Sequence, residues 1–144
     1  MNKIHILLVE DNEGDIVLTL DALAEGKIIN DVTVIKNGWD AIQFLERKGN
    51  HIHARYPDLI LLDVNLPKMN GHEVLHAIKS NNALKHIPVI ILTTSSSEKD
   101  VLEAYKNHAN CFITKPVEAD DFLKVVNSIE EFWISIVKLP PTKQ

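Results

Sequence analysis

Five polar side chains of this sequence stand at or just after the ends of short apolar runs. They are Glu10, Asp11, Asp63, Thr93 and Lys115. Carboxylates that lie close together repel one another, and they stay ionised together only when a cation joins them. Oxygen ligands with room for water suit Mg²⁺ better than zinc. A lysine ammonium attracts an anion and a threonine hydroxyl donates to its oxygens, so the set fits a phosphoryl group, with Asp63 as a metal ligand, a nucleophile or both.

The apolar runs predict the strands that must position these side chains. They cover residues 4–9, 32–35, 59–62, 89–92 and 111–113, and apolar residues at helical spacing follow each run. This alternation predicts an α/β fold, a doubly wound parallel sheet with helices on both faces and a long final helix over residues 122–137. Because the carboxyl ends of parallel strands share one edge of the sheet, we expect the five side chains to face one crevice.

Length, charge and cysteine content exclude several classes of protein. A chain of 144 residues suits one domain, which we expect to span residues 1–144 with a tail at 139–144. The formal net charge of −5, without blocks of like charge, argues against a nucleic-acid surface. We also expect neither a membrane span nor an export leader, because no apolar run is long enough and the chain enters a strand directly. Cys111 is the only cysteine, so a reducing, cytoplasmic location is expected.

Four stretches of the sequence together resemble the receiver domain of two-component response regulators. They are residues 8–11, 61–71, 91–94 and 114–116, and they follow the order of the family over nearly the whole chain. The resemblance implies a flavodoxin-like fold with five parallel strands in the order 2-1-3-4-5 and an extended C-terminal helix. It also implies a function as a phosphoacceptor, which catalyses only its own phosphotransfer and dephosphorylation.

The same resemblance implies roles for the acidic residues. Asp63 matches the phosphoacceptor aspartate of the family. Glu10 and Asp11 match the acidic pair that organises Mg²⁺, with Glu10 in place of the more common aspartate and Asp11 as the expected direct ligand. Asn65 matches the position whose backbone carbonyl binds the metal. Mg²⁺ is therefore the expected cofactor.

The remaining positions that match the family belong to its switch. Thr93 matches the hydroxyl and Lys115 the ammonium that move toward the phosphoryl group. Phe112 matches the aromatic residue whose rotamer follows Thr93. The Lys115–Pro116 peptide bond is expected to be cis. Thr94 replaces the small apolar residue that often follows the switch threonine, which would alter access to the phosphoryl group.

The resemblance also predicts partners. The phosphoryl donor is a phosphohistidine on a sensor histidine kinase, and phosphorylation changes the surface of the last two helices and the strand between them. We expect a downstream protein target, because nothing after the final helix could bind DNA or catalyse a reaction. Residues 130–140 and 83–88 resemble the small response regulators that partner bacterial phytochromes. Apolar residues in the last turns of the final helix predict a homodimer contact: Phe132, Trp133, Ile136 and Val137.

Three alternatives remain open at the level of sequence. A Mg²⁺-dependent phosphohydrolase could use the same aspartyl phosphate, although it would need a second carboxylate where this chain has Asn65. A receiver-shaped binding module could remain unphosphorylated, although such modules usually lose the acceptor or the lysine. His72 and His76 match the H-E-x-x-H pattern of zinc proteases, but we expect both to be solvated because Val74 and Ile78 define the buried face of that helix.

Overall fold

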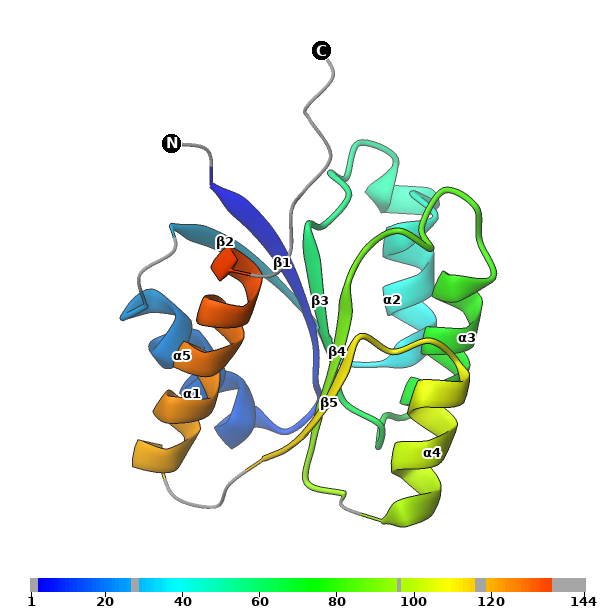
Figure 1. Cartoon of the computed structure of the whole chain (residues 1–144). Coiled ribbons are helices and arrows are strands. Elements are labelled where there is room, and N and C mark those ends of the chain that lie inside the picture. Colours follow the sequence, from blue (N-terminus) through cyan, green and yellow to red (C-terminus); the bar gives the residue numbers. More distant parts are fainter. Residues whose placement is uncertain (1–2, 27–28, 96, 116–118, 136–144) are drawn as a thin grey trace.

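In the computed structural model, which describes residues 3–26, 29–95, 97–115 and 119–135, five parallel strands form one central sheet. The order of the strands is β2-β1-β3-β4-β5 (Figure 1). Their bounds are β1 Ile4–Val9, β2 Asn30–Ile35, β3 Leu59–Leu62, β4 Val89–Thr93 and β5 Cys111–Thr114. The predicted strand order and parallel sheet are therefore confirmed.

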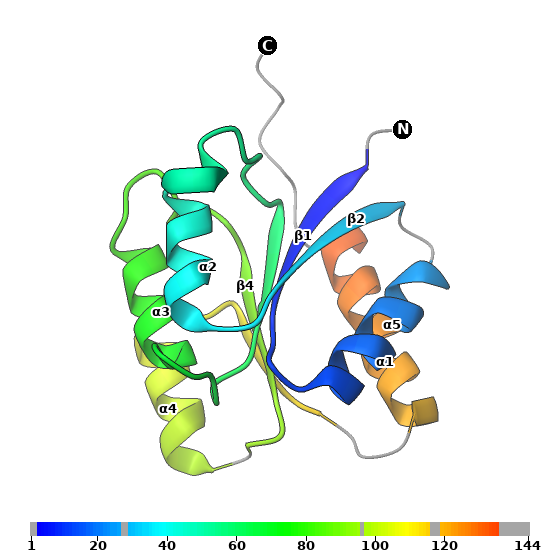
Figure 2. The same cartoon turned by 180° about the vertical axis from the view of Figure 1, so that it is seen from behind.

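Helices cover both faces of this sheet, as Figures 1 and 2 show. The helices α1 (Glu13–Ala24) and α5 (Ala119–Ser135) lie on one face. On the other face lie α2 (Gly38–Leu45), α3 (Gly71–Lys79) and α4 (Glu98–Lys106), and a short 3₁₀ turn (Gly49–His51) follows α2. The predicted doubly wound architecture is confirmed. Among the described helices, none combines the length and the apolar character needed to cross a bilayer.

Apart from His5 in β1 and Thr93 in β4, the central strands β1, β3 and β4 are apolar, because both of their faces are covered. Successive side chains point to opposite faces, so Leu7 and Ile60 pack in the core beneath α2 and α3, while Ile6 and Leu61 pack in the core beneath α1 and α5. All four are at most 2% exposed. Burial of each such side chain contributes about 1.5–3 kcal/mol. The two cores hold the carboxyl ends of β1 and β3 rigidly side by side.

Side-chain caps begin two of the helices close to the carboxyl edge of the sheet. Asn70 accepts from the Glu73 amide over 3.0 Å and Glu73 accepts from the Asn70 amide over 3.0 Å, which makes a capping box at the start of α3. Ser97 accepts from the Asp100 amide over 3.1 Å at the start of α4. These caps fix where the chain turns from strand to helix, which is the region around the candidate site.

Several element bounds differ from the sequence-based prediction. The second strand begins at Asn30 rather than residue 32, because Asn30 and Asp31 pair with Ile4 and His5 of β1 in spite of their polar side chains. Thr93 lies within β4 instead of after it, and Thr114 lies within β5, because the two residues pair with each other across the sheet. Backbone pairing with a neighbouring strand thus extends strands beyond their apolar runs.

Candidate functional site

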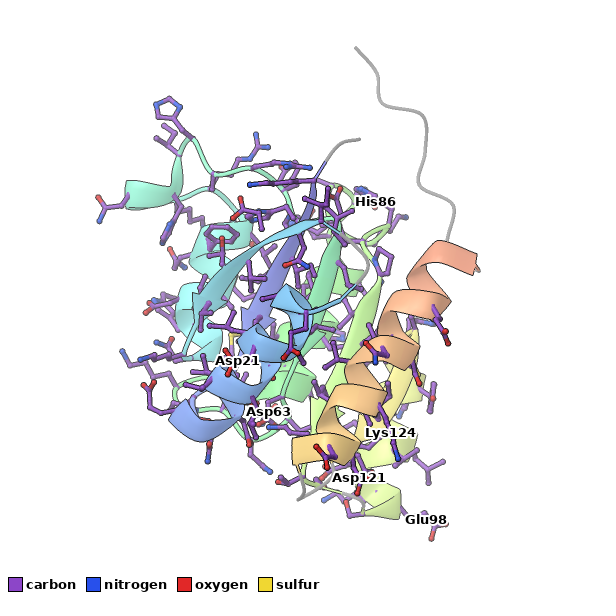
Figure 3. All side chains as sticks on the ribbon, turned by 90° about the vertical axis from the view of Figure 1, so that its left-hand side faces the viewer. Asp21, Asp63, His86, Glu98, Asp121 and Lys124 are labelled. Atoms are coloured by element: carbon purple, nitrogen blue, oxygen red, sulfur yellow. The ribbon has the colours of Figure 1, made fainter. Side chains whose placement is uncertain are left out.

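Two carboxylates lie just past the carboxyl ends of β1 and β3. The Asp63 amide donates to the Val9 carbonyl over 3.1 Å, which continues the β1–β3 pairing beyond the strands and sets Asp63 beside Glu10. Asp63 is 6% exposed and Glu10 is 3% exposed. Figure 3 shows Asp63 in the lower half of the molecule, toward the end where α4 and α5 begin. The sheet register therefore holds two acidic groups together with little access to water.

Glu10, Asp11 and Asp63 form an acidic cluster that could hold a divalent cation. Each offers one carboxylate oxygen, and these oxygens all lie within 4.8 Å of one another. Glu10 and Asp63 are buried, whereas Asp11 is exposed, so an ion can enter from the side of Asp11. Hard carboxylate oxygens with an open, solvated side are the donor set that Mg²⁺ and Mn²⁺ prefer. The residues fit such a metal.

Lys115 from the end of β5 places its ammonium among the carboxylates. Its Nζ donates to Glu10, to Asp15 Oδ2 over 2.8 Å and to Asp63 Oδ2 over 3.3 Å. The lysine side chain is only 2% exposed. The backbone of Lys115 is anchored to β4, because its amide donates to the Thr93 carbonyl over 2.7 Å. A buried ammonium thus offsets part of the mutual repulsion of the acidic groups.

The pKa values of Glu10 and Lys115 are both raised, for different reasons. Burial raises the pKa of Glu10 to about 7, the hydrogen bond from Lys115 offsets part of that rise, and the charge of Asp63 adds to it. Burial alone would lower the pKa of Lys115, but its hydrogen bonds to Asp15 and Glu10 outweigh that effect and raise the pKa. Lys115 therefore stays cationic at neutral pH, while Glu10 titrates near pH 7.

Asp15 is a member of the site that the sequence did not reveal. It lies in the first turn of α1, where acidic residues are common because they interact favourably with the helix dipole. That ordinary explanation hid its contact with Lys115, which is 100 residues away in the chain. The side chain of Asp15 is 24% exposed, so this carboxylate forms the solvent-facing wall of the site.

The Asp63 carboxylate is held at both of its oxygens. Oδ2 accepts from Lys115, and Oδ1 accepts from the Asn65 amide over 3.2 Å. The Asn65 amide therefore orients the carboxylate of the predicted phosphoacceptor. The predicted use of the Asn65 backbone carbonyl as a metal ligand stays a prediction.

Thr93 and Phe112 lie on the adjacent strands β4 and β5. Thr93 is fully buried, and its Oγ1 accepts from the Ser95 amide over 3.3 Å. Phe112 is partly buried and packs against the core beneath α2, α3 and α4. The Phe112 amide donates to the Tyr105 hydroxyl over 3.2 Å. The structure thus places Thr93 at the edge that bears Asp63 and Phe112 further inside the sheet, and their roles as a switch pair stay predictions.

Comparisons with known proteins agree with this geometry. The family described as the response regulator receiver domain matches residues 6–127. The chain belongs to the response regulator receiver family. The receiver is 44% identical over 135 residues to the response regulator Rcp1 from Synechocystis sp., an alignment that covers 94% of this chain and 92% of Rcp1.

Solved structures of phytochrome response regulators share the fold of this receiver. The phosphorylated cyanobacterial phytochrome response regulator RcpA superposes with a TM-score of 0.92 and 45% identity, over 96% of this chain and 99% of RcpA. The Mn²⁺-bound form of Rcp1 superposes with a TM-score of 0.89 and 44% identity, over 95% of this chain and 99% of Rcp1. The predicted resemblance to phytochrome response regulators is therefore confirmed.

The prediction that His72 of the receiver is solvated is wrong. His72 is 8% exposed, and its Nε2 lies 2.9 Å from Asp100 Oδ1 on α4. His72 stands one turn before the buried Leu75, so it lies at the flank of the buried face, and α4 covers that flank. His76 is exposed, as expected. The two histidines do not share a solvated face.

Some predictions about the receiver concern residues beyond the described part of the chain. Pro116 lies outside the described residues, so the expected cis bond after Lys115 stays a prediction. Ile136 and Val137 also lie outside them, and the side chains of Phe132 and Trp133 are not described. The homodimer contact predicted for these four residues therefore stays a prediction as well.

Proposed function

We propose that Asp63 accepts a phosphoryl group from a histidine kinase and that the receiver transmits this event through a changed protein surface. The observation that supports the proposal best is the shared environment of the Asp63 carboxylate. One of its oxygens contacts the Lys115 ammonium and the other contacts the Asn65 amide, beside Glu10 and Asp11. A carboxylate that is buried, oriented and next to a cation is suited to nucleophilic attack on phosphorus.

Mg²⁺ is the metal that we propose for the site. Glu10, Asp11, Asp63 and the backbone carbonyl of Asn65 would hold it. When bound, the ion would neutralise charge on the phosphoryl oxygens during transfer. The two buried members of the cluster and the exposed Asp11 give a donor set of oxygens only, which supports this choice over zinc.

The residues of the chain have distinct tasks in the transfer. An Asp63 oxygen attacks phosphorus, the P–N bond of the phosphohistidine breaks, and its electron pair stays on the imidazole nitrogen. Lys115 offsets the negative charge of the phosphoryl oxygens. Thr93 then exchanges its contact with the Ser95 amide for donation to a phosphoryl oxygen, and Phe112 fills the space that Thr93 leaves. The surface formed by α4, β5 and α5 changes with them and contacts a downstream protein.

The kinase partner that we propose is of the phytochrome type, and we propose a cytoplasmic location for this receiver. RcpA and Rcp1, which are 45% and 44% identical to this chain, support this assignment. The resemblance of residues 83–88 and 130–140 to phytochrome partners agrees with this assignment.

The two alternative functions receive less support. A phosphohydrolase would need an acid-base carboxylate two residues after the nucleophile, where Asn65 stands. An unphosphorylated binding module usually lacks the acceptor or the lysine, whereas Asp63 and Lys115 are both present here. The receiver would thus hold a phosphoryl group temporarily and catalyse only its own phosphotransfer and dephosphorylation.

Phosphotransfer from purified kinases tests the proposed partner. A phytochrome-type kinase carrying labelled phosphohistidine should lose its label to this chain within seconds to minutes. A histidine kinase from an unrelated signalling pathway, mixed with the same chain, should retain its label. The label on the chain should not exceed one phosphoryl group per molecule. Transfer from both kinases at equal rates would overturn the phytochrome assignment, and sustained release of phosphate from a generic phosphate ester would favour the phosphohydrolase.

A further inference from the structure

The buried His72 connects α3 to α4 by a direct side-chain contact. Its Nε2 lies 2.9 Å from Asp100 Oδ1, and the imidazole side chain is 9% exposed. An ionised carboxylate can only accept, so Nε2 carries the proton in this hydrogen bond. Among the described residues, no group pairs with the buried Nδ1 of His72. The imidazole is therefore held in place by Asp100 alone, away from water.

Asp100 extends this contact into the loop between β4 and α4. Its Oδ2 accepts from the Ser95 hydroxyl, while its own amide donates to Ser97 Oγ over 3.1 Å. The hydrogen bonds from Ser95 and His72 lower the pKa of Asp100, so it accepts as an anion at neutral pH. Charge-assisted hydrogen bonds of this kind are stronger than neutral ones. Asp100 thus ties the loop to α3 on one side and to α4 on the other.

Ser95 carries the connection to the proposed switch residue. Its hydroxyl donates to Asp100, and its backbone amide donates to Thr93 Oγ1 over 3.3 Å. As long as Ser95 stays in this position, the hydrogen bond from its amide favours the present rotamer of Thr93 over one that turns toward Asp63. The series of contacts also approaches Asp63 from the His72 end. Gly71 precedes His72, and its amide donates over 2.8 Å to the carbonyl of Val64, the residue after Asp63.

We propose that His72 is a positioning residue that, through Asp100 and Ser95, holds Thr93 in its resting orientation and so opposes phosphorylation of Asp63. This inference rests on the proposed function. Loss of the His72 contact frees the loop between β4 and α4, and Thr93 then reaches the phosphoryl group at a lower cost. The H-E-x-x-H pattern in the sequence therefore marks a contact between two helices rather than a zinc site.

His72→Leu tests the proposal, because it removes the donor and keeps an apolar side chain of similar bulk. With acetyl phosphate and Mg²⁺, the rate of phosphorylation followed by intact mass should rise about fivefold, the lower end of typical coupling between sites. His72→Gln keeps an amide donor near the position of Nε2 and should return the rate toward that of the wild type. His76→Leu, on the exposed side of the same helix, should leave the rate unchanged.

A Thr93→Ala background separates positioning of the switch from a general effect on the fold. If His72 acts through Thr93, His72→Leu should have no further effect in that background. A persistent acceleration there, or a His72→Leu rate equal to that of His76→Leu, would overturn the proposal. If His72→Leu unfolds, Asp100→Ala, which removes the acceptor for both His72 and Ser95 at the more exposed partner, carries the same test with the same expected acceleration. Failure of the wild type to accept any phosphoryl group would overturn both the proposed function and this inference.

Discussion

Lys115→Met should destabilise the fold by about 3 kcal/mol at pH 8, because it removes one partner of a buried ionic cluster. The ammonium is shared by Glu10, Asp15 and Asp63, and its side chain is only 2% exposed. Methionine fills a similar volume but supplies no charge. The carboxylates that remain would repel one another in a site with little water, which is the main source of the expected loss.

The loss should depend on pH in a definite direction. Burial already raises the pKa of Glu10 from its ordinary value of 4.5 to about 7, and Lys115 works against that rise. A carboxyl group whose pKa is raised in the folded state favours folding below its unfolded pKa, and that contribution is lost as the pH rises through the folded pKa. The Lys115→Met receiver should therefore be most stable near pH 5 and lose stability progressively toward pH 8, more steeply than the wild type.

Urea unfolding with and without Mg²⁺ measures both effects. Mg²⁺ should restore part of the stability of Lys115→Met at pH 8, because a divalent cation would replace the missing charge. Lys124→Met is the matched control, since the Lys124 side chain is 80% exposed on α5 and its ion pair with Asp121 lies at the surface (Figure 3). If Lys115→Met is as stable as Lys124→Met at pH 8 and its stability does not respond to Mg²⁺, the claim that the ionic cluster around Lys115 stabilises the fold is wrong.

Gly71→Ala should destabilise the receiver by about 2–3 kcal/mol, the upper range for overpacking. A Cβ at this position would lie 2.2 Å from the Asp63 carbonyl oxygen and 2.7 Å from Val64 Cα. Both are backbone atoms, so the start of α3 or the segment that bears Asp63 must shift. The same shift would displace the acceptor carboxylate, and we expect weaker Mn²⁺ binding along with the lower stability.

Gly14→Ala is the appropriate comparison for this variant. The added Cβ would meet only Asn12 Oδ1, a side-chain atom at 3.3 Å, so stability should change by less than about 1 kcal/mol. Chemical unfolding measures the stability of both variants, and Mn²⁺ titration followed by the relaxation of water protons measures their metal affinity. Equal stability and metal affinity of Gly71→Ala and Gly14→Ala would show that the close approach of α3 to the Asp63 segment is not needed for either property.

Much of the fold could be predicted from the sequence because its strands are buried on both faces. The apolar runs before Glu10 and Asp63 locate β1 and β3, and alternation with helices implies a parallel sheet whose carboxyl ends meet. The number of residues over which neighbouring strands pair is harder to predict. Asn30 and Thr93 lie in strands because their backbones pair with neighbouring strands, which the polarity of a side chain does not reveal.

The candidate site could be predicted only where a side chain ends a strand. Glu10, Asp63 and Lys115 do so, and parallel topology alone brings them together. Asp15 and His72 reach their partners from helices, across 100 and 28 positions of the sequence, and each has an ordinary explanation as a surface residue. Contacts between helices depend on their packing angles, so no local pattern identifies them.

Intact mass after incubation with acetyl phosphate and Mg²⁺, for the wild type and for Asp63→Asn, tests the central claim most directly. Asparagine keeps the shape of the side chain but removes the nucleophilic carboxylate. The wild type should gain the mass of one phosphoryl group, which should be absent when the metal is chelated, and Asp63→Asn should gain none. An unchanged gain of one phosphoryl group in Asp63→Asn would contradict the account, because the acceptor would then be another residue.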